Sequence, residues 1–368
     1  MAIAPTTPQQ VTVLIVDDSA FMRKALQMML ESDPNIKVIG QARDGEEGVE
    51  KVRRLKPDLV TMDIEMPRMD GLTALKEIMA HNPTPVMMIS SLTSEGAKAT
   101  LDALELGAVD FIPKEMSYVS LNIVKIKEEL LAKIKVIVKR KSLLMAKYRL
   151  KNKIGMVRTA TPTATPGVIT PTPVIRKRSH QINLVAIGSS TGGPPALQSV
   201  ITKLPRNFPV GIVVAQHMPP KFTASLAERL NGLSQLQVKE AVDGDRVEAG
   251  VVLIAPGGKH ILVRKHGAIA HAVITDEPKA ALYHPCVDVM MNSVAEHYNS
   301  SGMGVILTGM GNNGMIGSRL LKSKGGIVIA QNEETCIVYG MPRAVIEAQL
   351  ADHIAPIESV AAEITSYF

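Results

Sequence analysis

The sequence predicts an α/β protein built from two doubly wound, parallel-sheet domains. Short apolar runs alternate with segments of helical periodicity, and this alternation occurs in two separate series. A stretch rich in Thr and Pro lies between the two series and predicts a linker. The chain has 368 residues, which is sufficient for two domains. We expect a first domain over 11–130, a connector over 131–180 and a second domain over 181–368.

The composition excludes several classes of protein. The chain is 46% hydrophobic and 21% charged, as is typical of globular proteins. Its two cysteines, Cys286 and Cys336, are too few for a disulfide scaffold and fit a reducing compartment. The N-terminal residues lack the basic and apolar regions of a secretory signal. No apolar run reaches the roughly 18 residues of a membrane span. We therefore expect a cytoplasmic protein with no membrane insertion.

The first series consists of five strand-like runs separated by helical segments, the first of which is 21–30. A β-α unit repeated five times over so short a length is typical of a parallel sheet covered by helices on both faces. Ligands of such sheets bind outside the carboxyl ends of the strands. The predicted strands are 11–16, 37–39, 59–62, 86–89 and 109–112.

Polar residues follow the ends of four of these strands. Asp17 and Asp18 follow the first strand, Asp63 the third, Ser90 the fourth and Lys114 the fifth. Three carboxylates at one edge would repel one another unless a hard cation lay among them, and Mg²⁺ prefers carboxylate oxygens. A nearby lysine and hydroxyl could hold phosphate oxygens, which makes Asp63 a candidate phosphoryl acceptor. Taken singly, each aspartate is more simply explained as a helix cap or turn residue.

Residues 11–130 resemble a response-regulator receiver domain. The motifs that carry the resemblance are Asp-Asp-Ser at 17–19, Met-Asp-Ile-Glu-Met-Pro-Arg-Met-Asp-Gly at 62–71 and Pro-Lys at 113–114. One departure is Glu115, where receivers usually have proline after the lysine. This exchange affects the loop and leaves the phosphate chemistry intact.

The resemblance implies a role for each matching residue. Asp18 and Asp63 would bind Mg²⁺, and Asp63 would be phosphorylated by a histidine kinase. We add Asp17 and Glu65 to the expected metal set. The residues that would form the phosphorylation switch are Ser90, Phe111 and Lys114.

A basic connector follows the first domain. Residues 120–150 have apolar residues near helical spacing and predict one long helix. Its second half is rich in Lys and Arg, over 133–153, with no Asp or Glu among them. A solvated connector explains this charge most simply, although it could also meet nucleic acid, an acidic membrane surface or an acidic partner protein. No helix-turn-helix pattern, zinc spacing or aromatic platform accompanies the charge, so we expect no nucleic-acid partner.

The second series begins with a strand, 184–187, that ends at a turn reading Gly-Ser-Ser-Thr-Gly-Gly over 188–193. A helix is expected near Pro194, because proline is favoured just inside a helix start. A serine on a tight strand-to-helix turn beside glycines is the arrangement of an exposed nucleophile, which makes Ser190 the candidate. A glycine-rich phosphate-binding turn is the alternative explanation.

Further strands are expected over 210–215, 251–255, 305–307 and 327–330, with an antiparallel hairpin formed by 261–263 and 268–274. His217 follows the strand 210–215, just as Ser190 follows 184–187. Neighbouring parallel strands would bring both side chains to one edge, where the imidazole could act as general base for the serine. A lone histidine is otherwise more often structural.

A second glycine-rich turn, Thr-Gly-Met-Gly-Asn-Asn-Gly at 308–314, follows another strand. Gly309, Gly311 and Gly314 fit the dinucleotide-binding fingerprint, and Glu333 lies about twenty residues further on. This fingerprint is short and often matched by chance. A dinucleotide site would also leave Ser190 and His217 without a role.

The second domain resembles the catalytic domain of the chemotaxis protein-glutamate methylesterases. The motifs that carry the resemblance are Gly-Ser-Ser-Thr-Gly-Gly at 188–193, Ala-Gln-His-Met-Pro-Pro at 215–220, Leu-Thr-Gly-Met-Gly-Asn at 307–312, Ala-Gln-Asn-Glu at 330–333 and Tyr-Gly-Met-Pro at 339–342. The resemblance implies hydrolysis of glutamate methyl esters on methyl-accepting chemoreceptors, with release of methanol, and deamidation of receptor glutamines. No cofactor is expected in this domain.

The same resemblance assigns the catalytic residues. Ser190 would attack the ester carbonyl and His217 would act as base and then acid. Backbone N–H groups near Thr191 and Met310 would stabilise the oxyanion. The family's third triad member is an aspartate, and that position is Asn313 in this sequence.

Asn313 is the departure that bears on activity. An amide oxygen can accept a hydrogen bond from imidazole, but it carries no charge to stabilise imidazolium, and the amide can also favour the wrong tautomer. The same exchange in the serine proteases lowers kcat by about 10⁴-fold. We therefore expect a weakened esterase. The alternative is a catalytically impaired receptor-binding or phosphoryl-sink protein. We also expect the unphosphorylated receiver to cover the esterase cleft.

Overall fold

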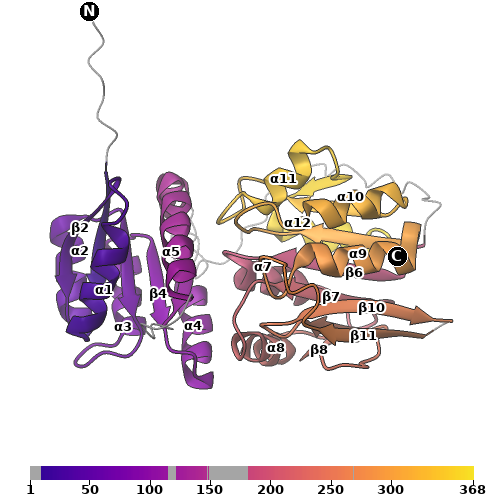
Figure 1. Ribbon diagram of the computed structural model, residues 1–368, viewed down its shortest axis with the longest axis horizontal. Helices are drawn as coiled ribbons and strands as arrows, with labels where there is room; N and C mark the ends of the chain where they lie inside the picture. The colour runs from indigo at the N-terminus through magenta and orange to yellow at the C-terminus, as the bar shows by residue number, and fades with distance from the viewer. Residues whose placement is uncertain (1–9, 115–121, 147, 149–180, 268) are drawn as a thin grey trace, which may run out of the picture.

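A computed structural model describes residues 10–114, 122–146, 148, 181–267 and 269–368. It contains two parallel sheets, each with helices against it, and one separate antiparallel hairpin (Figure 1). The predicted α/β class, with a five-stranded parallel first domain and a second parallel domain carrying a hairpin, is confirmed.

The first domain has a five-stranded sheet in the order β2-β1-β3-β4-β5, and every pairing is parallel. Helix α1 contacts α5, while α2, α3 and α4 pack in a row. Side chains of Ser19, Asp44, Asp70 and Thr93 cap the first four helices. The elements are β1 (Val11–Val16), α1 (Ala20–Leu30), β2 (Ile36–Ala42), α2 (Gly45–Leu55), β3 (Leu59–Asp63), α3 (Gly71–His81), β4 (Val86–Ser90), α4 (Ser94–Leu106), β5 (Asp110–Pro113) and α5 (Asn122–Lys139).

The second domain has a seven-stranded parallel sheet in the order β14-β13-β12-β6-β7-β9-β8. Its elements are β6 (Leu184–Ser189), α7 (Gly193–Ile201), β7 (Gly211–Gln216), α8 (Phe222–Leu233), β8 (Gln237–Glu240), β9 (Val251–Ile254), β10 (His260–His266), β11 (Ile269–Thr275), α9 (Val287–Tyr298), β12 (Gly302–Ile306), α10 (Met315–Ser323), β13 (Ile327–Gln331), α11 (Met341–Glu347), β14 (His353–Ala355) and α12 (Ile357–Thr365). Both edge strands, β8 and β14, are absent from the sequence-based prediction.

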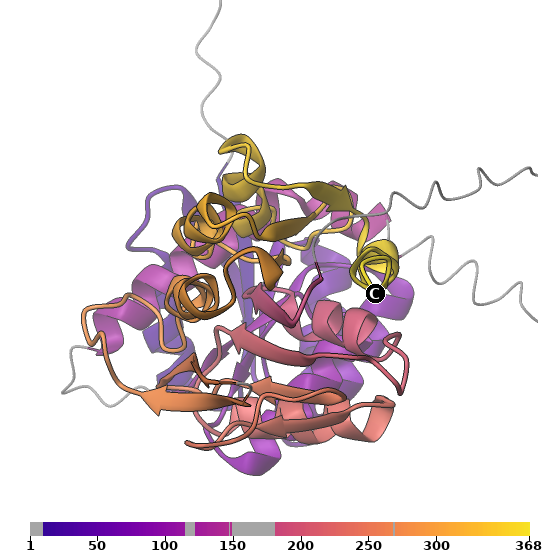
Figure 2. The same ribbon diagram turned by 90° about the vertical axis from the view of Figure 1, so that its right-hand side faces the viewer.

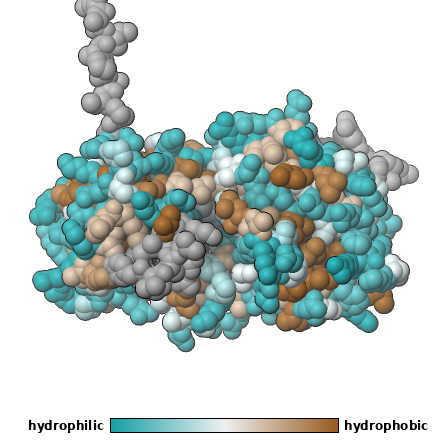
Figure 3. All heavy atoms as spheres, in the orientation of Figure 1, coloured by the Kyte–Doolittle hydropathy of each residue, from teal (hydrophilic) through white to brown (hydrophobic). Residues whose placement is uncertain are grey.

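The hairpin β10–β11 is antiparallel, as predicted, but it forms a two-stranded sheet of its own. Two perpendicular views show it lying outside the seven-stranded sheet (Figures 1 and 2). No helix in the described ranges is long and apolar enough to cross a membrane. The face of the molecule in Figure 3 is mainly hydrophilic, with scattered apolar side chains.

The predicted single helix over 120–150 is wrong, because α5 ends at Lys139 and a turn at Arg140 precedes a second helical stretch, 141–146. The interpretation of its charge as a solvated face is wrong for Lys133, whose side chain is only 11% exposed. Lys133, Lys135 and Lys141 each pair with an aspartate of the first domain, namely Asp110, Asp33 and Asp58. Lys139 and Arg140 also lie in the described part of the connector, whereas Lys147, Arg149, Lys151, Lys153, Arg176, Lys177 and Arg178 lie outside it.

Helices α4 and α5 and strand β5 of the first domain face α7 and α8 of the second (Figure 1). Ion pairs join the outer part of this contact. Arg229 pairs with Asp102 at 2.6 Å and with Glu105, and Lys98 pairs with Glu228 at 3.1 Å. The two domains therefore meet through α4 and β5 of the first and α7 and α8 of the second.

Candidate functional site

The carboxyl ends of β1 and β3 bring three aspartates together. Single carboxylate oxygens of Asp17, Asp18 and Asp63 all lie within 4.8 Å of one another. Asp17 and Asp63 are buried and Asp18 is exposed. Asp17 Oδ2 has no hydrogen-bond partner in the described part of the chain, and Lys114 Nζ lies 3.4 Å from it. A set of hard oxygen donors with a spare buried oxygen fits a divalent cation such as Mg²⁺.

Lys114, at the end of β5, extends into the same cluster. Its ammonium donates to Asp63 Oδ2 at 2.5 Å. Burial raises the pKa of Asp63 to about 6, and the Asp17 charge adds to this while Lys114 opposes it. Burial also raises the pKa of Asp17. A bound cation would relieve the cost of holding these carboxylates ionised.

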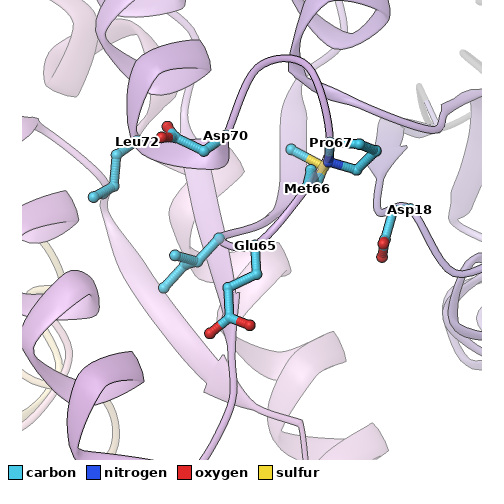
Figure 4. Close-up of a pocket in the computed structure, with 7 residues that line it drawn as sticks. Asp18, Glu65, Met66, Pro67, Asp70 and Leu72 are labelled. Atoms are coloured by element: carbon cyan, nitrogen blue, oxygen red, sulfur yellow. The ribbon is translucent and has the colours of Figure 1, made fainter.

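Glu65 does not join the cluster, although we included it in the expected metal set. It lies in the loop after β3, where it lines an open cavity of about 590 Å³ beside Asp18 (Figure 4). The two carboxylates lie apart in that view. Glu65 is exposed and lies outside the three-aspartate cluster.

The two other predicted switch residues make their side-chain contacts with other elements. Ser90 Oγ donates to the Gly96 carbonyl at 3.1 Å and accepts from Thr100 Oγ1 at 2.7 Å, so it is bonded to α4. Phe111 is buried and stacks on Phe222 of α8, with ring centroids 4.7 Å apart and planes at 6°. The predicted switch aromatic, Phe111, is thus part of the contact with the second domain.

In the second domain, Ser190 lies in the predicted turn between β6 and α7. Ser189 Oγ donates to Gln216 Oε1 at 2.6 Å, and Gln216 Nε2 donates to the Ser190 carbonyl at 2.9 Å. These bonds fix the turn to the end of β7. A Cβ on Gly193 would come within 1.9 Å of Gln216 Oε1, so the helix can start here only with glycine.

The loop after β12 packs directly on this turn. The Ser190 amide donates to the Thr308 carbonyl at 3.0 Å, and a Cβ on Gly309 would lie 2.8 Å from Ser190 Cβ. The backbone amides of Thr191 and Met310 have no acceptor within the described residues. Both therefore remain candidate oxyanion donors.

His217 follows β7, and its amide donates to the Ser189 carbonyl at 3.1 Å. The imidazole is half-buried, and it stacks on Tyr283 with ring centroids 4.1 Å apart. Burial lowers its pKa to about 4, so it is neutral at pH 7 and able to accept a proton. His217 Nε2 lies 3.0 Å from Asn313 Oδ1. Its Nδ1 is buried with no partner in the described chain, and no hydrogen bond joins it to Ser190.

Asn313 uses all of its hydrogen-bonding capacity. Its Oδ1 accepts from the Val287 amide at 2.7 Å as well as facing His217. Its Nδ2 donates to Asp288 Oδ2 at 2.7 Å and to Cys286 Sγ at 3.1 Å. The predicted serine, histidine and asparagine thus lie at one edge of the sheet, as the strand positions require.

Three residues of this site are absent from the sequence-based prediction. Gln216 fixes the serine turn, Tyr283 covers one face of the imidazole, and Asp288 holds the asparagine amide. Gln216 lies next to His217 at the end of β7, which is a signal that could have been used. Tyr283 and Asp288 come from a loop and a helix start, and no spacing rule relates them to the other residues.

The dinucleotide interpretation of 308–314 finds no support in the geometry. Gly309 donates to the Val338 carbonyl and packs on the serine turn. Glu333 lies instead at the domain contact, where Arg140 donates to its carbonyl at 2.6 Å. The glycines allow close packing of the loop around the candidate nucleophile.

The first domain lies directly over this edge. Thr191 Oγ1 donates to Asp110 Oδ2 at 2.7 Å, and both side chains are buried. Lys133 of α5 pairs with Asp110 at 2.9 Å and with Glu129 at 2.8 Å. The Glu129 charge is near enough to act on the pKa of His217. In this arrangement Asp110 of the first domain contacts Thr191, the residue that follows Ser190.

Comparisons with known proteins agree with this organisation. The family model described as CheB methylesterase matches residues 185–364, and the response regulator receiver domain model matches residues 13–123. A protein of Nitratidesulfovibrio vulgaris named protein-glutamate methylesterase/protein-glutamine glutaminase 2 is 50% identical, over 96% of this chain and 98% of that protein. A protein of Oleidesulfovibrio alaskensis named protein-glutamate methylesterase/protein-glutamine glutaminase 1 is 49% identical over the same shares.

Among solved structures, the CheB methylesterase catalytic domain of Thermotoga maritima matches with a TM-score of 0.50 and 44% identity. The match covers 51% of this chain and all of that one. The fold and the sites define a two-domain response regulator in which a receiver precedes a methylesterase-type domain. The chain belongs to the CheB methylesterase family.

Proposed function

We propose that this protein hydrolyses glutamate methyl esters on chemoreceptors, releases methanol, and deamidates receptor glutamines in the cytoplasm. The observation that carries this proposal is the convergence of Ser190, His217 and the free amides of Thr191 and Met310 at one sheet edge. The near full-length relatives named for these two activities support the substrate. Nothing in the comparisons favours the alternative of an impaired binding protein.

The proposed reaction is acyl transfer through Ser190. His217 Nδ1 takes the hydroxyl proton as Ser190 Oγ attacks the ester carbonyl, and the same proton then goes to the departing methoxide to give methanol. Water hydrolyses the acyl-enzyme by the same steps and releases the glutamate carboxylate. The amides of Thr191 and Met310 stabilise each tetrahedral oxyanion. Asn313 Oδ1 accepts from protonated Nε2, and we propose that its lack of charge makes turnover slower than with aspartate.

In the receiver, we propose that Asp63 accepts a phosphoryl group from a histidine kinase. Asp17, Asp18 and Asp63 would hold Mg²⁺, which neutralises charge as the phosphoryl group transfers. Lys114 would contact a phosphate oxygen, because its ammonium already donates a hydrogen bond to the Asp63 carboxylate. Ser90, Phe111 and Lys114 would report the phosphorylated state.

We also propose that the unphosphorylated receiver inhibits the esterase by covering it. The buried Thr191–Asp110 hydrogen bond and the Phe111–Phe222 stack support this arrangement. The fragment 180–368 should then turn over substrate faster than the unphosphorylated full chain. An equal or slower fragment would count against inhibition by the receiver.

The experiment that tests the function is methanol release from methylated receptor membranes, with a small-molecule phosphodonor present. Ser190→Ala should abolish release. Ser199→Ala is the matched control, because Ser199 lies on α7 and only donates to the Pro195 carbonyl. Methanol release that survives Ser190→Ala would show that the nucleophile or the reaction is wrongly assigned.

A further inference from the structure

Asn313 can serve a histidine base only if its amide points one way. Its oxygen must face His217 Nε2, because only then is that nitrogen the protonated one and Nδ1 the basic one. A reversed amide would offer N–H to Nε2 and move the proton to Nδ1. A neutral amide has no intrinsic preference between the two orientations, so its neighbours decide.

Two neighbours fix this orientation. The Val287 amide donates to Oδ1 at 2.7 Å, and Asp288 Oδ2 accepts from Nδ2 at 2.7 Å. Reversing Asn313 would place its N–H donors against the Val287 N–H and its oxygen against the Asp288 carboxylate. Both contacts would become repulsive in a buried site, where unmatched polar groups are costly.

The two oxygens of Asp288 perform different tasks. Oδ1 accepts from the amides of Gly314 and Gly317, at 2.9 and 2.8 Å, and so caps the start of α10. Oδ2 accepts from Asn313. A residue needed only as a helix cap would require the first set of bonds and not the second.

We infer that Asp288 is a positioning residue for the esterase, which orients the Asn313 amide and so sets the tautomer of His217. This inference rests on the proposed function of Ser190 and His217. The inference also changes the activity that we expect of a site with Asn313 in place of aspartate. Among the described residues no carboxylate is bonded directly to His217, but the Asp288 carboxylate is bonded to the Asn313 amide that faces it. This charged hydrogen bond polarises the amide and makes its oxygen a stronger acceptor for the imidazole N–H.

A double-mutant cycle on the full-length protein tests this role. The four proteins are wild type, Asp288→Asn, Asn313→Asp and the double variant, assayed for methanol release with phosphodonor. In the wild-type background, Asp288→Asn keeps an oxygen for the α10 cap but presents N–H to the Asn313 N–H. We expect kcat to fall by about 10²-fold or more, because a wrong tautomer costs as much as about 10⁴-fold in a serine triad.

In the Asn313→Asp background no amide remains to be oriented, and the new carboxylate faces Asp288 Oδ2 where Asn313 Nδ2 lies at 2.7 Å. Asp288→Asn would relieve this repulsion, so kcat in this background should not fall. This background is therefore the control for the capping role. Equal losses in both backgrounds would overturn the inference and leave Asp288 as a helix cap only.

The tautomer itself provides a readout that does not depend on turnover. Nitrogen-15 NMR spectra at pH 7 report which imidazole nitrogen carries the proton. The His217 signal is assigned by its absence from the spectrum of His217→Gln. In the wild type this signal should show protonated Nε2. It should show protonated Nδ1 in a large fraction of Asp288→Asn. An unchanged tautomer in Asp288→Asn refutes the inference. If the wild type shows no Ser190-dependent turnover, the proposed function fails, and the NMR result still decides the role of Asp288.

Discussion

Both domains place polar residues at the carboxyl ends of parallel strands. The group of residues in the receiver is highly charged, whereas the group in the esterase domain is mostly neutral. The receiver edge holds three carboxylates within 4.8 Å and an ammonium 2.5 Å from one of them. The esterase edge presents a hydroxyl, a neutral imidazole and an amide. Within the second domain, the Asp288 carboxylate lies behind this amide.

This difference follows from the chemistry proposed for each edge. Phosphoryl transfer brings several negative charges to one place. The receiver must therefore supply carboxylate ligands for a metal ion and a positively charged side chain, Lys114. Ester hydrolysis begins with a neutral substrate and develops one oxyanion, for which free backbone amides suffice. The esterase therefore needs His217 to accept a proton, and it does not need several charged groups close together.

Removal of the base gives the largest expected effect at the esterase edge. His217→Gln should lower kcat for methanol release by about 10²–10⁴-fold, the usual contribution of general acid–base catalysis. His266→Gln, in the exposed hairpin, serves as control. A loss of less than tenfold would mean that another group accepts the serine proton.

The covered state of the esterase should be visible in the titration of His217. Burial lowers its pKa to about 4 in the described arrangement. In the fragment 180–368 the receiver is absent, so the pKa should rise toward 6.5, by up to about 2 units. NMR titration of both proteins measures this shift. Identical pKa values would show that the receiver contributes nothing to the burial of His217.

Most of the fold could be predicted from the sequence, because buried parallel strands are continuous apolar runs. The runs 11–16 and 184–187 lie in β1 and β6, and the predicted helix start near Pro194 lies in α7. The edge strands β8 and β14 could not be found in this way, since they are short and carry polar residues such as Lys239 and His353.

The limits of sequence reasoning are clearer in the sites. Ser190, His217 and Asn313 follow strands, so topology alone brings them together. Asp288 could not be found, because an acidic residue in the first turn of a helix is ordinary and its second hydrogen bond depends on tertiary structure. The basic residues of α5 illustrate the reverse error. Their charge suggested a solvated face, whereas Lys133 lies in a buried pair with Asp110.

At the receiver edge, the crowded charge should reduce stability. Burial raises the pKa of Asp63 to about 6, so the native protein binds more protons than the unfolded chain between about pH 4 and 6. The contribution of this group to stability therefore falls as the pH rises through that window. Asp63→Asn should stabilise the protein at pH 7 by about 3 kcal/mol, since the pKa rises from 3.8 to about 6 and each pKa unit is worth about 1.4 kcal/mol.

Thermal or denaturant unfolding at pH 7 and at pH 4 measures this gain, which should nearly vanish at pH 4. Mg²⁺ should stabilise the wild type and have less effect on Asp63→Asn, because it binds the native carboxylates. Asp70→Asn, which changes an exposed carboxyl that caps α3, is the control. A gain that persists at pH 4 would show that charge is not its cause.

The smallest expected effect lies where the two domains meet, at the stack of Phe111 on Phe222. Such a pair contributes about 0.5–1.5 kcal/mol beyond its buried area. Phe111→Leu keeps most of the apolar volume but removes the stack, so the receiver should release the esterase more often. Basal methanol release without phosphodonor should rise about 2–10-fold, the same energy expressed as a rate ratio. Phe208→Leu is the matched control, because it breaks an edge-to-face pair with Phe368 inside the esterase domain. If both variants raise basal release equally, the gain reflects a loosened esterase, and the stack does not hold the domains together.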